Sequence, residues 1–362
     1  MTDDTGARSR PPTHTAWRWA LIGLAVAGSA AAFGYVAGWL APERLTPHRL
    51  VNAVAANGGE HAGFRRNHAK GVCVAGRFEA SGALAGFSTA RLFAAGASTP
   101  VVGRFALPGS NPYAADSSVP IRSLALRFDL PDGEQWRTGM NAMAVFPVST
   151  PQAFYALQLA THPDPATGKP DPAKTKAFFA SHPETASFLA WVKTAKPSAS
   201  YATETYRSIN AFYLRDAAGD RHAVRWAMVP EQPAEGDGGP AAGDTDYLAA
   251  DLGKRLAAGP LRWHLQMVFA APGDAVDDAT RVWPDDRRTV DAGTLVLTSS
   301  QPQAEGPCRD VNYDPTILPR GIETSDDPLL AARSATYADS YLRRTSEEAH
   351  VPGTKHPGED KR

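Results

Sequence analysis

The sequence predicts an α+β fold, in which an antiparallel β-barrel or strongly curved sheet carries inserted helices and a closing C-terminal helix. Several short segments alternate apolar with polar residues, most clearly 123–130, where Leu124, Leu126 and Phe128 occupy every second position. The 362 residues include 30 prolines and 31 glycines, and 43% of the residues are hydrophobic. In a globular chain this composition indicates many turns between strands rather than low complexity.

The N-terminal region contains a candidate membrane segment. Residues 1–18 are polar and carry Arg8, Arg10 and Arg18, and residues 19–41 are uncharged and largely apolar. A helix needs about 20 such residues to span a bilayer. Arginines before the span predict a cytoplasmic N-terminus, with the rest of the protein on the periplasmic or other extracytoplasmic side. A cleaved signal peptide is the alternative, although the apolar stretch exceeds its usual length of about 7–15 residues.

The remaining elements follow from local patterns. We expect a short helix at 47–57, strands at 72–80, 99–107, 123–130, 222–229 and 262–269, and helices at 150–162, 171–182 and 183–195. A Pro/Gly/Asp-rich loop covers about 230–245, and a polar tail covers 347–362. We therefore expect one domain, 45–346, after the apolar segment.

The predicted closing helix carries two arginines and a tyrosine along one face. Asp327 is a plausible N-cap before Pro328, so the helix is predicted to run to about Arg344. Arg333, Tyr337 and Arg344 then project from one face. A tyrosine beside a buried cation has its phenolate favoured, and a phenolate can ligate iron. On spacing alone, Tyr337 is better explained as an amphipathic residue at the edge of the core, as most helical tyrosines are.

Charge and cysteine content exclude several functions. The 37 basic and 38 acidic residues nearly cancel, so we expect no nucleic-acid partner. Cys73 and Cys308 are too few for a disulfide scaffold or a four-cysteine zinc site. They allow one disulfide in an oxidising compartment. Without that bridge, Cys73 is either a redox-active thiol or a packed strand residue.

The closing helix also carries a longer motif. In ARSATYADSYLRR, the residues Arg333, Tyr337, Asp339 and Arg344 match the spacing of the catalase proximal signature, which this segment resembles. Further catalase-like segments follow in family order: RRNHAKG with Arg65 and His68, TPVVGRF with Arg104, IRSLALRF, and MNAMAVF with Asn141. The resemblance covers about 47–346 and is closest to the short catalase-related peroxidases. It implies a catalase-like barrel whose C-terminal helix supplies the haem ligand.

The resemblance implies a b-type haem, bound noncovalently with its iron on Tyr337. Arg333 is expected to keep the phenolate ionised. Arg65, Arg104 and Arg344 match the family's partners for the haem propionates, for which guanidinium forks are suited. The alternative for each arginine is a surface ion pair, for Arg333 with Asp339.

His68 and Asn141 are the implied catalytic residues. His68 is expected to take a proton from peroxide and return it to the departing oxygen, and Asn141 to orient the peroxide. Without the motif, His68 is explained as a solvated histidine and Asn141 as an ordinary loop asparagine.

Three departures from the family pattern bear on activity. Ala106 replaces a serine that usually hydrogen-bonds the distal histidine, Asn67 replaces an apolar residue, and Ser123 replaces a glycine. A less ordered, more polar pocket disfavours peroxide dismutation, which needs close placement of a second peroxide. We therefore expect a peroxidase that uses organic hydroperoxides and/or hydrogen peroxide with a small-molecule or protein electron donor. Catalase activity is expected to be weak or absent.

Two other functions fit the same resemblance. One is a haem-binding sensor or carrier without turnover, which Ala106 favours. The other is an enzyme that rearranges fatty-acid hydroperoxides with the same tyrosine, histidine and asparagine. Family analogy also suggests a homodimer.

Overall fold

A computed structural model describes residues 13–41, 44–196, 198–232 and 244–350. Contacts divide the chain into two units, 1–49 and 50–362, which we treat separately. The predicted tail from 351 onward and most of the predicted loop at 230–245 lie outside the described residues.

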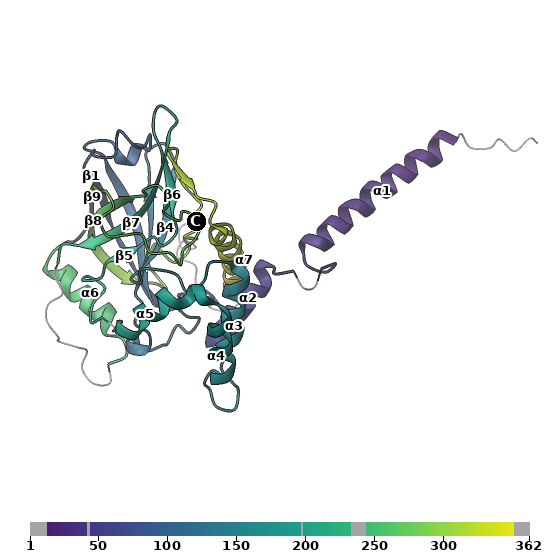
Figure 1. Ribbon diagram of the computed structural model, residues 1–362, viewed down its shortest axis with the longest axis horizontal. Helices are drawn as coiled ribbons and strands as arrows, with labels where there is room; N and C mark the ends of the chain where they lie inside the picture. The colour runs from purple at the N-terminus through teal and green to yellow at the C-terminus, as the bar shows by residue number, and fades with distance from the viewer. Residues whose placement is uncertain (1–12, 42–43, 197, 233–243, 351–362) are drawn as a thin grey trace, which may run out of the picture. The chain divides into compact units, whose positions relative to one another are not determined.

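The first unit contains a long apolar helix, α1 (Thr13–Val36), coloured purple in Figure 1. Its segment Ala16–Val36 is long and apolar enough to cross a membrane, a property that signal sequences share. The helix ends five residues before the end of the predicted segment 19–41, because Gly38 adopts φ +82° and the chain turns. The second helix, α2 (Pro47–Gly58), matches the helix predicted at 47–57.

The second unit is built on a closed antiparallel barrel, as predicted. Its ring consists of β1 (Gly71–Ala80), β2 (Ser98–Ala106), β3 (Ser123–Asp129), β4 (Gln135–Asn141), β5 (Tyr206–Arg207), β7 (Arg221–Pro230), β8 (Leu261–Phe269) and β9 (Thr289–Pro302). Pairing of β9 with β1 closes the ring. Two short strands, β6 (Phe212–Arg215) and β10 (Ile322–Thr324), extend the sheet beyond β7.

The barrel interior is an apolar and aromatic core. Leu124, Leu126 and Phe128 of β3 are buried, as their alternation predicts. Trp136 and Trp226 pack edge to face with ring centroids 5.1 Å apart. Fully burying a large apolar side chain stabilises the fold by roughly 1.5–3 kcal/mol. Because this core fills the interior, a ligand site must lie on the outer face of the sheet.

Helices cover part of that outer face. The predicted helical insertion is present as α3 (Pro151–Ala160), α4 (Pro172–Ser181) and α5 (Ala186–Thr194), with the single turn η3 (Pro183–Thr185) before α5. The chain also forms η1 (Arg91–Phe93), η2 (Asp116–Ser118) and α6 (Tyr247–Ala258), which the pattern analysis does not predict. The closing helix is α7 (Pro328–His350), which lies beside β4 in Figure 1.

The closing helix continues past Arg344 and four residues into the segment predicted as a polar tail. Two contacts explain the extension. Glu347 accepts a hydrogen bond from the Gly63 amide at 2.9 Å and forms an ion pair with Arg66. Glu348 is buried and lies 3.3 Å from a guanidinium nitrogen of Arg309. Tertiary ion pairs therefore hold a last turn whose sequence is polar.

Candidate functional site

A cavity of about 220 Å³ lies between the outer face of the sheet and α7. It is lined mainly by apolar side chains, among them Val54, Phe146 and Phe154. The seven predicted catalytic and cofactor-binding residues all line this cavity: Arg65, His68, Arg104, Asn141, Arg333, Tyr337 and Arg344. The fold therefore brings the N-terminal part of the domain, near residue 65, and its C-terminal helix to the same cavity.

Three strands form the floor of the cavity, and four of the six residues in its two rows are small. One cross-strand row consists of Arg104, Ala125 and Gly139, and the next consists of Ala106, Ser123 and Asn141. Residues opposite one another share a face, and rows two residues apart are separated by about 7 Å. Because most of these side chains are small, the floor leaves room for a flat group beside the sheet.

Tyr337 lies over one row of this floor. A Cβ atom on Gly139 would stand 3.8 Å from the Tyr337 hydroxyl and 3.1 Å from Arg333 Nη2, so glycine permits the close approach of α7. Arg333 Nη2 lies 3.4 Å from the Tyr337 hydroxyl. The guanidinium is therefore positioned to stabilise negative charge on that oxygen.

A hydrogen-bonded chain holds Arg333 in place. Its Nη1 donates to Asn210 Oδ1 at 2.5 Å, and Asn210 Nδ2 donates to Asp327 Oδ2 at 2.7 Å. Asp327 also caps α7, because its Oδ1 accepts from the Leu329 amide at 2.9 Å. Asp339 pairs with Arg343 at 2.7 Å. In these contacts the partner of Arg333 is Asn210, and the partner of Asp339 is Arg343.

His68 lines the cavity in a strained backbone conformation, with φ +54°. Asn67 stabilises this turn, since its Oδ1 accepts hydrogen bonds from the amides of His68 at 2.9 Å and Gly109 at 2.8 Å. Burial, together with the positive charges of Arg104, Arg333 and Arg65, lowers the pKa of His68 to about 3. At neutral pH the imidazole is therefore uncharged and able to accept a proton.

The His68 Nδ1 atom is buried and has no hydrogen-bond partner in the described part of the chain. Ala106, which occupies the position where a serine was expected from the resemblance, offers no hydroxyl. An unpaired buried nitrogen of this kind is costly unless a ligand or water satisfies it.

Asn141 ends β4 and is held by its cross-strand neighbour. The Ser123 hydroxyl donates to Asn141 Oδ1 at 2.6 Å. Because the amide oxygen is engaged, Nδ2 remains the group available to donate to a ligand.

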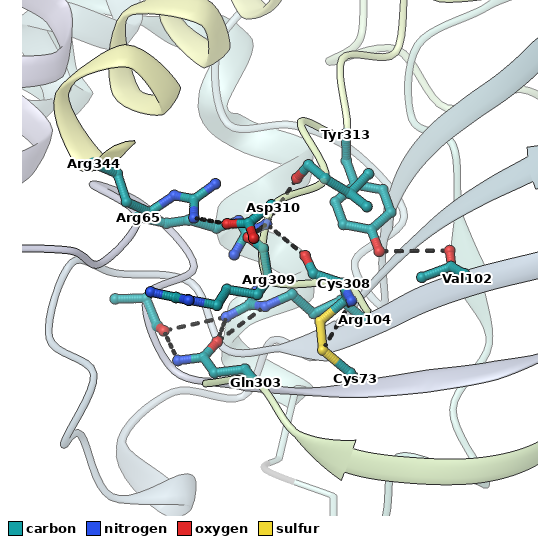
Figure 2. Close-up of a disulfide and its surroundings, with 12 residues drawn as sticks. Arg65, Cys73, Val102, Arg104, Gln303, Cys308, Arg309, Asp310, Tyr313 and Arg344 are labelled. Carbon is teal, nitrogen blue, oxygen red and sulfur yellow. Dashed lines mark hydrogen bonds and ion pairs between the residues drawn. A yellow bond between two sulfur atoms is a disulfide. The ribbon is translucent and has the colours of Figure 1, made fainter. Parts of the chain in front are cut away.

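The three predicted carboxylate-binding arginines form a cluster, drawn in Figure 2. Arg65 Nη2 donates to the carbonyls of Cys308, Arg309 and Val311 at 2.8–3.1 Å. Arg104 Nε donates to Gln303 Oε1 at 3.1 Å, and Arg344 Nη1 lies 3.3 Å from Asp310 Oδ1.

Electrostatics make this cluster receptive to anions. Burial and the charges of Arg104 and Arg344 hold the pKa of Arg65 well below its ordinary value. Burial lowers the pKa of Arg104 to about 10. Both guanidinium groups donate mostly to neutral oxygens, so a ligand carrying two carboxylates would relieve their mutual repulsion.

These features fit a haem. A phenol faces the cavity near the Gly139 row, His68 has an unpaired nitrogen there, and three arginines can meet two propionates. Within the described residues, no group of three or more His, Cys, Asp or Glu side chains is placed to hold a metal ion. Tyr313, Tyr337 and Tyr341 all line the cavity. Tyr337, whose hydroxyl lies beside Arg333, is the candidate iron ligand.

The sequence analysis did not identify several residues that contact the predicted site residues. Asn210 and Gln303 were not singled out, and Asp327 was singled out only as a helix cap. Asn67 and Ser123 were noted as departures from a family pattern, without the contacts that they make. Both Asn210 and Gln303 lie within 47–346, the stretch that resembles the family, but no quoted motif marks either residue.

The two cysteines form a disulfide, with Cα atoms 5.3 Å apart. Both residues are fully buried. Of the alternatives left open by the sequence, the structure therefore shows the bridge.

Comparisons with known proteins agree with this geometry. The family model described as "Catalase" matches residues 36–354. The chain is 38% identical over 331 residues to a catalase-related peroxidase of Synechococcus elongatus, covering 91% of this chain and 97% of the relative. It is 32% identical over 304 residues to a catalase-related peroxidase of Mycolicibacterium paratuberculosis, covering 83% and 95% respectively.

Solved structures support the fold. A fungal catalase matches with a TM-score of 0.70 and 21% identity, covering 79% of this chain. A bacterial catalase matches with a TM-score of 0.70 and 20% identity, covering 82% of this chain. The match spans 60% of each of those longer chains.

Proposed function

The chain belongs to the catalase family, and from this we propose that it is a haem-dependent peroxidase with weak or no catalase activity. Its substrates are organic hydroperoxides and/or hydrogen peroxide, reduced with electrons from an external donor. The observation that carries this proposal is the convergence of Tyr337 with Arg333, and of His68 with Asn141, on one cavity.

The chain's own residues supply binding and proton transfer. Tyr337 would hold the iron, and Arg65, Arg104 and Arg344 would hold the propionates. When bound, haem supplies the redox-active iron at which the peroxide O–O bond is broken. His68, neutral because of its lowered pKa, takes the proton from the peroxide and returns it to the departing oxygen, which leaves as water or an alcohol. Asn141 Nδ2 orients the peroxide by donating a hydrogen bond.

We further propose that α1 anchors the protein and that the domain lies on the extracytoplasmic side. The apolar helix and the buried disulfide support this, because disulfides persist in oxidising compartments.

An absorption spectrum recorded before and after addition of tert-butyl hydroperoxide and an electron donor tests the proposal. We expect a high-spin ferric haem band that changes with peroxide, oxidation of the donor and formation of tert-butanol. His68→Ala should keep haem and lose the fast peroxide reaction, whereas Tyr337→Phe should alter or weaken haem binding.

The alternatives give different results in the same assay. Bound haem with unconsumed peroxide and donor would favour a sensor or carrier, for which the unpaired His68 Nδ1 is the supporting observation. With a fatty-acid hydroperoxide, a rearranged oxide in place of the alcohol would identify a rearranging enzyme. Rapid peroxide turnover by His68→Ala would refute the acid–base role of His68.

A further inference from the structure

We propose that the Cys73–Cys308 disulfide is a positioning element of the cofactor site: it fixes the 303–311 loop, which in turn fixes the arginines that bind the propionates. This inference rests on the proposed function, because it concerns the binding of haem. It assigns to the bridge a role in ligand binding beyond general stabilisation.

The 303–311 loop contacts all three arginines. Its backbone carbonyls at Cys308, Arg309 and Val311 accept from Arg65 Nη2. Figure 2 shows Gln303 at one end of this loop beside Arg104, and Asp310 near its other end beside Arg344.

The loop also touches the segment that carries His68. Gln303 Nε2 donates to the Ala69 carbonyl at 2.9 Å, and Arg104 Nη2 donates to the same oxygen at 3.2 Å. The position of the loop therefore affects both the carboxylate-binding side of the cavity and the residue that follows His68.

The bridge is a second covalent attachment of this loop to the barrel, besides its main-chain link to β9. Strand β9 ends at Pro302, so the loop lacks the ladder hydrogen bonds that hold the strand to β1. Cys73 lies within β1, and the Cys308 amide donates to Cys73 Sγ at 3.2 Å. A Cβ atom on Gly306 would stand only 2.6 Å from Cys73 Cβ, so the loop packs tightly against the strand.

Like charges make such an attachment useful. Burial is the largest cause that lowers the pKa of Arg65, and the charges of Arg104 and Arg344 lower it further, whereas Tyr313 and Asp310 act in the opposite direction. Asp310 of the 303–311 loop lies 3.3 Å from Arg344, so this loop already offsets part of the repulsion among the three guanidinium groups. Fixed carbonyl acceptors on a fixed loop hold them together, which reduces the ordering cost that haem binding must overcome.

The test is a haem titration of the full-length haem-free protein in detergent. Wild type is compared with the Cys73→Ala/Cys308→Ala double variant, and deuterium uptake of residues 303–311 is measured in parallel. We expect the double variant to bind haem at least about tenfold more weakly, with faster exchange in the loop, because the arginines lose their preorganised acceptors.

A matched control separates this effect from loss of stability. Met267→Ala removes a buried side chain from the barrel core and leaves the loop and bridge intact. We expect it to lower the unfolding temperature while leaving haem affinity and loop exchange unchanged. An equal loss of affinity in Met267→Ala would show that the bridge acts only through overall stability, which would overturn the inference.

A second variant keeps the test decisive if the double variant does not fold. Gln303→Ala removes the side-chain acceptor of Arg104 and retains the bridge, so it should weaken haem binding by a smaller factor. Unchanged affinity in Gln303→Ala, or wild-type affinity and exchange in the double variant, would refute the role of the loop. A wild-type protein that binds no haem would instead refute the proposed function.

Discussion

The amide of Asn141 faces the cavity in one orientation because Ser123 occupies its oxygen. The resemblance to catalases predicts glycine at position 123 and serine at position 106, which lie side by side in one cross-strand row. In this chain the hydroxyl belongs to Ser123 and lies beside Asn141. His68 Nδ1 has no hydrogen-bond partner among the described residues. Ser123 thus fixes which end of the Asn141 amide, the donor Nδ2 or the acceptor Oδ1, is presented to a ligand.

Substitution of Ser123 should expose this role. Ser123→Ala allows the amide to turn its oxygen toward the peroxide, at a cost of about one hydrogen bond, or ~1 kcal/mol. We expect the second-order rate constant for peroxide to fall about fivefold with haem affinity unchanged, as measured by stopped-flow absorption. Ser123→Thr, which keeps the hydroxyl, should retain the wild-type rate. An unchanged rate in Ser123→Ala would show that Asn141 is oriented by other contacts.

His68 should make the stability of the haem-free protein depend on pH. Its pKa is 6.5 as the ordinary value and about 3 in the folded chain, so the unfolded chain binds more protons between these values. The contribution of His68 to the free energy of unfolding is fully present above about pH 6.5. It is lost as the pH falls, and the loss is roughly 2–3 kcal/mol at pH 4.5.

Urea unfolding of wild type and His68→Gln at pH 7 and pH 4.5 measures this contribution. Wild type should lose more stability than His68→Gln over this interval, because glutamine does not titrate. Equal losses would show that His68 accepts a proton in the folded state as readily as in the unfolded state.

Individual site residues were predictable where a motif fixes their spacing. Arg333, Tyr337 and Arg344 share a helix face, and the structure places all three at the cavity as expected. Asn210 and Gln303 were not predictable, because their roles depend on which distant segments meet. Helical periodicity determines a face, but it cannot identify the residue that packs against it.

At the scale of elements, the start of α7 determines where Arg333 points. Asp327 both caps the helix and holds Asn210, and it is buried. Asp327→Ala removes the cap and leaves the buried Asn210 amide unpaired. We expect the free energy of unfolding to fall by about 1–3 kcal/mol in chemical denaturation.

The neighbouring residue provides the control for this prediction. Asp326 is exposed, and Asp326→Ala should change stability by less than about 0.5 kcal/mol. Similar effects of the two substitutions would assign the loss to charge near the helix terminus rather than to the contacts of Asp327.

Element types were predicted better than their ends. The helix α1 stops early because Gly38 turns the chain, and α7 runs on because Glu347 and Glu348 find cationic partners. The turn at Gly38 is a local effect, whereas the partners of Glu347 and Glu348 come from distant segments, which hydropathy and propensity do not contain. The register between β1 and β9 is a further example. It shifts between Ala75 and Gly76 of β1, and periodicity alone does not specify such a shift.

At the scale of the whole molecule, alternation and turn content predicted an antiparallel barrel or strongly curved sheet, and the family resemblance predicted the barrel, but neither came with the order of the strands. That order depends on long-range pairing of β9 with β1, which no local pattern encodes. The location of the molecule is likewise a prediction, from the apolar helix and the disulfide. The apolar segment Ala16–Val36 is consistent with an anchor or with a signal sequence.

Fractionation of cells that produce the full chain distinguishes these two outcomes. An uncleaved anchor predicts a protein of intact mass that stays with membranes after alkaline carbonate washing and is released by detergent. A shortened protein in the soluble periplasmic or secreted fraction would show cleavage. Mass spectrometry of the N-terminus provides the measurement.

Closure of the barrel has a consequence for folding kinetics. The disulfide joins cysteines separated by 235 positions, and β9 closes the ring on β1. We expect such non-local contacts to form late, because the entropy of a long chain segment must be lost before they are made. The cavity combines residues near 65 with residues near 340, so we expect it to be completed when the ring closes. An unfinished or C-terminally truncated chain would therefore lack part of the cavity lining, and the proposed haem binding would require a molecule that has finished folding.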